Sequence, residues 1–106
     1  MKTNAKIDFT AVKNFKCLNG NVQMLFLILS CADGNGAIRL GKKDFSKYLS
    51  ITEQTAGNYI KSFVKSSVLK YKYSGEMRVN PNFYYAGDEN NFEKALEGYN
   101  TFKSDM

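Results

Sequence analysis

Apolar residues recur with helical spacing in two neighbouring segments, residues 43–49 and 53–66. Residues at i, i+3 and i+4 share one face of an α-helix. The apolar positions are Phe45, Tyr48 and Leu49 in the first segment and Ala56, Ile60, Phe63 and Val64 in the second. Thr52 precedes the second segment and predicts its N-cap, because a threonine hydroxyl accepts a hydrogen bond from the first helical turn. Two helices joined by such a short turn predict a helix-turn-helix.

The opposite face of segment 53–66 is small, polar and basic. It consists of Gln54, Thr55, Gly57, Asn58, Lys61 and Lys65. A helix face of this composition suits the major groove of duplex DNA, where base edges present hydrogen-bond donors and acceptors. We therefore expect base contacts from Gln54, Thr55, Asn58 and Lys61.

Residues 68–73 and 77–80 alternate between apolar and polar positions and predict a hairpin that turns at Gly75. After a helix-turn-helix, such a hairpin is a wing, and the short strand predicted over residues 37–40 would pair with it. Lys70 and Lys72 share one face of the hairpin. Tyr71 and Tyr73 face the other side, where we expect them to pack. The expected phosphate contacts are Lys42, Lys43, Lys65, Lys70, Lys72 and Arg78.

Residues 21–32 are apolar on most sides and predict the central core helix, with an extension into a dimer interface left open. Two glycines in residues 33–36 end this helix. A glycine-rich phosphate loop is the alternative there. It is weak, because no Gly-Lys-Ser/Thr sequence closes the loop.

Asp88 predicts the cap of a last helix with an apolar stripe. The stripe consists of Phe92, Ala95, Leu96, Tyr99 and Phe102. It either folds back onto the domain or pairs with a second copy. The expected fold is α+β, mainly α, a winged helix-turn-helix with a C-terminal amphipathic helix. Its parts are an N-terminal leader with a short strand (residues 1–18), the winged helix-turn-helix domain (19–87) and the C-terminal helix (88–106).

Charge is distributed unevenly along the chain. Residues 1–87 carry thirteen Lys and Arg and five Asp and Glu, a net +8, whereas residues 88–106 carry two Lys and five acids, a net −3. The basic part coincides with the predicted helix-turn-helix and wing, which favours an anionic partner such as duplex DNA.

Several kinds of catalytic and metal-binding sites need residue types that the chain does not contain. The chain has no histidine, which removes the usual nucleophile–histidine pairs and histidine metal sites. We expect no enzyme activity, no catalytic residue, no metal and no cofactor. The start lacks a signal-peptide pattern and no apolar run could span a membrane, so we expect a cytoplasmic protein without membrane contact. Cys31 is expected to be a core residue, and a disulfide with Cys17 is the alternative.

The order of these segments resembles the winged-helix plasmid replication proteins of Firmicutes, the RepL family. The resemblance covers residues 20–100 and rests on residues 38–40, residues 51–63 and, above all, residues 77–88, where Asn80-Pro81-Asn82 is followed by three aromatics. It implies a DNA-binding replication protein of a plasmid or phage. The segment from Ala56 to Asn58 differs from the Val-Ser-Arg type of triplet that is commoner in the family.

The sequence leaves several functions open. The first is sequence-specific binding of double-stranded DNA, as a homodimer at a replication origin with replication proteins as further partners. Transcriptional repression by the same fold is an alternative. A second hypothesis is a protein-interaction module that does not bind DNA, favoured by Gly57 and by the missing arginine. Single-strand binding through Tyr71, Tyr73 and the interleaved lysines is a third.

Overall fold

The structure is a computed structural model and describes residues 20–106. This part of the chain is an α+β domain, mainly helical, with a three-stranded antiparallel sheet. Its elements are α2 (Gly20–Cys31), β1 (Ala37–Ile38), α3 (Lys42–Leu49), α4 (Glu53–Lys65), β2 (Leu69–Lys72), β3 (Glu76–Val79), the 3-10 helix η1 (Glu89–Asn91) and α5 (Phe92–Thr101). The leader and strand predicted within residues 1–18 lie outside the described residues, as does Cys17.

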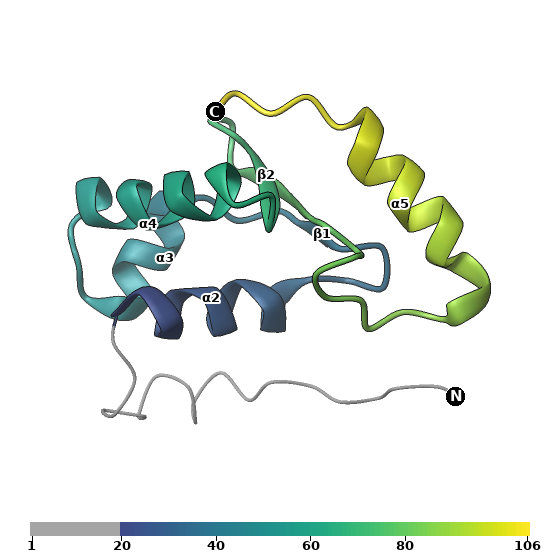
Figure 1. Ribbon diagram of the computed structural model, residues 1–106. Helices are drawn as coiled ribbons and strands as arrows, with labels where there is room; N and C mark the ends of the chain where they lie inside the picture. Colours follow the sequence, from purple (N-terminus) through teal and green to yellow (C-terminus); the bar gives the residue numbers. More distant parts are fainter. Residues whose placement is uncertain (1–19) are drawn as a thin grey trace.

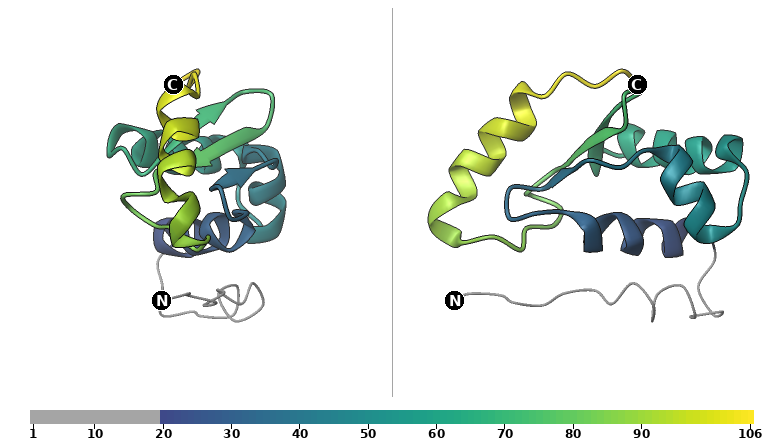
Figure 2. Two further views of the ribbon diagram at one scale, coloured as in Figure 1. Left: turned by 90° about the vertical axis from the view of Figure 1, so that its right-hand side faces the viewer. Right: turned by 180° about the vertical axis from the view of Figure 1, so that it is seen from behind.

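The sheet separates two helical layers. The strand that precedes the helix pair joins the hairpin, as the sequence predicts, but it is shorter than the predicted residues 37–40. It pairs with β3, so the strand order is β1-β3-β2. Helices α2, α3 and α4 lie on one side of the sheet, and α5 lies on the other (Figure 1). The view from behind in Figure 2 shows the same separation.

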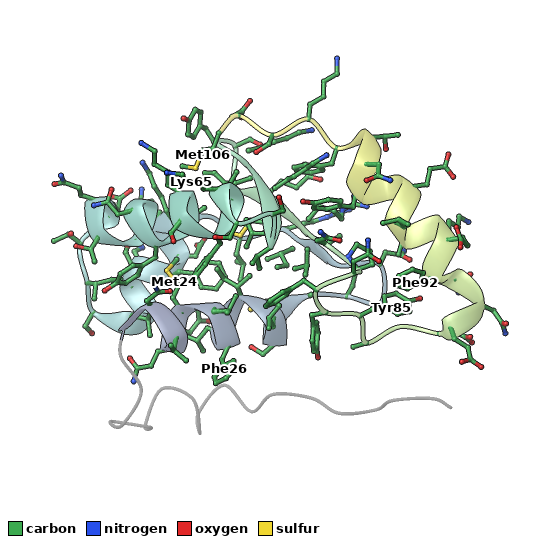
Figure 3. All side chains as sticks on the ribbon, viewed as in Figure 1. Met24, Phe26, Lys65, Tyr85, Phe92 and Met106 are labelled. Atoms are coloured by element: carbon green, nitrogen blue, oxygen red, sulfur yellow. The ribbon has the colours of Figure 1, made fainter. Side chains whose placement is uncertain are left out.

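The main core fills the space between the sheet and helices α2, α3 and α4. Helix α2 contributes Met24, Leu27, Ile28 and Leu29, which confirms its expected core role. Figure 3 shows Met24 pointing from α2 into this core, whereas Phe26 lies on the other side of the helix and packs only partly buried against the core margin. Burial of so many large apolar side chains is the main stabilising contribution of this layer.

The two helices after β1 begin and end within one residue of their predicted bounds. Thr52 caps α4, and its hydroxyl accepts a hydrogen bond of 3.1 Å from the backbone N–H of Thr55. One position of α3 differs from the prediction, because Tyr48 is 48% exposed and Ser46 is buried instead. Ser46 satisfies its hydroxyl by donating to the carbonyl oxygen of Lys43 at 2.8 Å.

The hairpin is confirmed, with Lys70 opposite Arg78 and Lys72 opposite Glu76 across β2 and β3. Its inner face packs on the helices, where Tyr71 is only 1% exposed. Tyr73 follows β2 at the turn and is 64% exposed, resting edge-on against Tyr71 at a centroid distance of 6.0 Å. Of the two tyrosines, only Tyr71 is therefore a core residue.

The C-terminal stripe folds back onto its own domain, which is one of the two alternatives. Ala95, Tyr99 and Phe102 are buried on the outer face of the sheet. Asp88 caps the start of this segment as predicted, but it caps η1, and α5 begins after it at Phe92. The ring of Tyr85 meets that of Phe92 edge-on at 5.2 Å where the preceding loop joins α5 (Figure 3).

Candidate nucleic-acid interface

The outward face of α4 is exposed and polar. Gln54, Asn58, Lys61 and Lys65 are all exposed, and within residues 20–106 none of their side chains makes a hydrogen bond or an ion pair. No residue of the described range therefore occupies their hydrogen-bonding groups or their positive charges. Thr55 differs from them, because it is half-buried and its hydroxyl accepts a hydrogen bond from Thr52 at 2.9 Å. A base contact from Thr55 would have to share that hydroxyl with the helix cap.

The N-terminus of α3 lies beside this face. A Cβ atom added at Gly57 would sit 3.6 Å from Cδ of Lys42, which is ordinary contact distance, so the lysine stem lies against α4 at this position. The helix start is fixed by Asp44, whose carboxylate accepts a hydrogen bond of 2.9 Å from the backbone N–H of Gly41. Lys43 is exposed next to Lys42. The structure thus brings Lys42 to the face of α4 that carries the predicted base contacts.

The hairpin turn adjoins the same helix start. A Cβ atom added at Gly41 would lie only 3.0 Å from Cα of Gly75, so the two backbones touch there. The backbone N–H of Lys42 also points to the Tyr71 hydroxyl, at 3.4 Å. Helix α4, the start of α3 and the turn of the hairpin are therefore continuous in space. We call this the α4 surface: Gln54, Asn58, Lys61, Lys65, Lys42, Lys43 and the turn at Gly75.

Arg39 is a candidate residue that the sequence reasoning missed. It is exposed and follows β1, one residue beyond the pair formed by Ile38 and Met77. Together with Ser74, Gly75 and Glu76 it lines a shallow hollow of about 420 Å³. The alternation of Arg39 with its apolar neighbours was the available signal, because alternate residues of a strand point to opposite faces. Arg39 brings a further positive charge to the hairpin turn.

The other three predicted phosphate contacts lie elsewhere. Lys70, Lys72 and Arg78 project from the outer face of the sheet, toward α5 and away from α4. Of the six predicted phosphate contacts, these three therefore lie on a different surface from Lys42, Lys43 and Lys65. The alternation of residues along the strand predicts that Lys70 and Lys72 share one face of the hairpin, but it does not show which element covers that face.

These three cations contact the end of α5 and the residue after it. Lys70 Nζ donates to the carbonyl oxygens of Tyr99 at 2.8 Å and Asn100 at 3.4 Å. Lys72 Nζ lies 4.6 Å above the ring of Phe102, and the Arg78 guanidinium carbon lies 5.6 Å from the same ring. The last carbonyls of a helix carry partial negative charge, and aromatic faces attract cations. Burial raises the pKa of the Tyr99 phenol in this contact.

The described residues hold no group of three or more Cys, Asp or Glu side chains that could bind a metal ion. No helix among them is long and apolar enough to cross a membrane. Comparisons of the chain with protein-family models, curated proteins and solved structures found no match.

Proposed function

We propose that this chain is a winged-helix protein that binds double-stranded DNA sequence-specifically through the α4 surface. The order of elements supports the fold: a core helix, a short strand, a helix-turn-helix and a hairpin that pairs with the short strand. The observation that carries the function is the exposed polar and basic face of α4, whose side chains have no partner within residues 20–106.

In this proposal α4 enters the major groove. Gln54 and Asn58 read base edges, since amide side chains suit the paired donor and acceptor of adenine. Lys61 contributes a further base contact, and Lys65 binds phosphate. Lys42 and Lys43 bind the phosphate backbone from the start of α3.

We further propose origin binding in plasmid or phage replication as the role of this DNA contact. It rests on the RepL-like segment that follows the hairpin, residues 77–88. In that role the protein acts as a homodimer and recruits replication proteins. A repressor would use the same surface, and selection of the preferred duplex followed by mapping to an origin or to a promoter distinguishes the two roles.

The test is fluorescence anisotropy of the full chain with labelled duplex and single-stranded DNA across a salt series. Each phosphate contact steepens the logarithmic salt dependence by about 0.9. We expect Lys61→Ala/Lys65→Ala to weaken duplex binding and to flatten this dependence by up to about 2. Lys94→Ala is the control, because Lys94 is exposed on α5 and its substitution removes one positive charge from the opposite layer.

Duplex affinity equal in the wild type and in Lys61→Ala/Lys65→Ala would exclude the α4 surface as the binding site. No duplex binding even at low salt would exclude the DNA function and would favour a protein partner. Stronger binding to single strands than to duplex would favour a role for the exposed Tyr73.

A further inference from the structure

Three cations lie side by side on the sheet face opposite α4. Lys70 and Arg78 are directly paired across β2 and β3, and Lys72 follows on the same face. Directly opposed like charges repel, so such a cluster is unfavourable unless something compensates for the charge. We call Lys70, Lys72 and Arg78 the sheet cluster.

Helix α5 and the residues after it cover the sheet cluster, and this cover compensates for the positive charge only in part. Within residues 20–106 no ion pair joins the sheet cluster to a carboxylate, although Glu76 lies opposite Lys72 across the strands, and the cluster's contacts are with two backbone carbonyls and two aromatic rings. Arg78 Nε is buried without any hydrogen-bond partner. A Cβ atom added at Gly98 would lie 2.7 Å from Arg78 Nη1, so the guanidinium is already pressed against α5. Buried donors are normally satisfied, and this cover leaves one that is not.

The cover is also separate from the main core. The core cluster is built from α2, α3, α4, the strands and the residues next to them, and it includes no buried side chain of α5. After α5, the chain runs along the free edge of β2. There the backbone N–H of Tyr71 donates to Ser104 Oγ at 3.1 Å, and the backbone N–H of Asp105 donates to the Tyr71 carbonyl oxygen at 2.8 Å. The backbone N–H of Tyr73 donates to the Asp105 carboxylate at 2.9 Å. Releasing α5 and this tail would leave the core packing in place.

We propose that the sheet cluster is a second binding site, for the phosphate backbone of a nucleic acid, and that α5 and the tail cover it in the free protein. Phosphate oxygens would accept hydrogen bonds from both lysines and from the arginine fork, including the Nε that now lacks an acceptor. This site lies on the opposite side of the sheet from the α4 surface and does not depend on it.

The test separates the two surfaces by starting from the full chain carrying Lys61→Glu/Lys65→Glu, which removes the positive charge of α4. Tyr99→Ala/Phe102→Ala is added to release the cover. The readouts are anisotropy with labelled random-sequence duplex and single strands, and hydrogen exchange of the Tyr71 and Tyr73 amides, which the tail protects. We expect faster exchange at these two amides, affinity about tenfold higher and a salt dependence steeper by about 2 to 3.

Adding Lys70→Ala/Lys72→Ala/Arg78→Ala to the released chain is expected to abolish this gain. The proposal is overturned if the two amides exchange faster while affinity stays unchanged, or if the gain survives removal of the three cations. Unchanged exchange would also overturn it, because these contacts would then not hold the cover.

A second release variant guards against loss of folding in the first. Asp105→Pro removes both the N–H that donates to Tyr71 and the carboxylate that accepts from Tyr73, without touching the core. Slow exchange of the Val79 amide, which donates to Gly36 at 2.8 Å, reports that the main sheet is intact. Because Tyr99 and Phe102 still contact the sheet cluster in this variant, we expect a gain in affinity of the same sign but smaller. An intact sheet with a released tail but no gain would contradict the proposal. Duplex binding lost on Lys61→Glu/Lys65→Glu alone bears only on the α4 surface.

Discussion

Lys70 makes two contacts with Tyr99, a hydrogen bond to its backbone and a cation–π contact with its ring. Its ammonium group lies 2.8 Å from the Tyr99 carbonyl oxygen and 4.6 Å from the centroid of the Tyr99 ring. The two residues are 29 positions apart in the chain. This contact ties the C-terminal helix to the sheet and places a positive charge at the negative end of the helix dipole.

Replacing Lys70 with methionine keeps much of the stem and removes the charge. We expect Lys70→Met to lower the free energy of unfolding by about 1 to 2 kcal/mol, because it removes a charged hydrogen bond and a cation–π contact. Urea unfolding measures the change. Lys94→Met is the control on an exposed part of α5 and should change stability by less than about 0.5 kcal/mol. Equal effects of the two substitutions would contradict the stabilising role of Lys70.

The cap of α4 depends on the hydroxyl of Thr52. Thr52→Ala leaves the N–H of Thr55 without this acceptor, and we expect a loss of about 1 kcal/mol in unfolding free energy. Thr52→Ser keeps the hydroxyl and should retain most of the stability. Thermal unfolding of the three proteins measures the difference, and a serine variant as unstable as the alanine variant would show that the cap is not the cause.

Two glycines respond in opposite directions to alanine. Gly57 lies within α4, where an added Cβ meets Lys42 at ordinary contact distance, so Gly57→Ala is expected to stabilise by about 0.5 to 1 kcal/mol. Gly36 has φ +78°, and a Cβ there would lie 3.0 Å from the Val79 carbonyl oxygen. We expect Gly36→Ala to destabilise by more than about 1 kcal/mol. Chemical denaturation of both variants tests the pair, and a shift of the same sign in both would argue against these local environments.

Cys31 is expected to react slowly with alkylating reagents. Burial raises the pKa of its thiol, an effect that a hydrogen bond with Ser30 only partly opposes. Less thiolate is then present at a given mildly alkaline pH than for an ordinary thiol, and thiolate is the reactive form. Peptide-resolved mass spectrometry after iodoacetamide treatment measures the rate, with the urea-unfolded chain as the reference.

The same pKa shift has a consequence for stability. A thiol with a raised pKa in the folded state contributes stability below its ordinary pKa, and this contribution is lost as pH rises through the folded value. We therefore expect Cys31→Ser to weaken the dependence of stability on alkaline pH. Equal alkylation rates in the folded and unfolded chains would contradict the burial of Cys31.

The elements that depend on local patterns were predicted well. Periodicity and a capping threonine gave α3 and α4 to within one residue, and alternation around Gly75 gave the hairpin. Tyr48 was misplaced because a helix of two turns has few apolar residues to define its inner face. Positions 45, 46 and 49 fall within about 100° around the helix axis, which leaves Tyr48 outside this sector. The small polar Ser46 could enter it by bonding its own helix backbone.

The candidate sites were predicted less completely, because they depend on contacts between distant segments. Alternation placed Lys70 and Lys72 on one face of the hairpin, and the uneven charge suggested an anionic ligand. The pattern carries no information on what packs against that face, and the covering contacts come from about 30 residues later in the chain. The apolar stripe of α5 was recognised, but its partner could not be read from its own spacing.

The residues after α5 bear on how two copies could meet. Ser104 and Asp105 form hydrogen bonds with the backbone of β2 along the edge that does not pair with β3. The opposite edge of the sheet is β1, which is only two residues long. Within residues 20–106, neither edge of the sheet offers a long row of unpaired amides, which is what strand-by-strand growth into a joint sheet requires. A homodimer would then form through helices and side-chain surfaces. Association of this kind leaves β2 protected and keeps the chain from the edge-to-edge stacking that leads to aggregates.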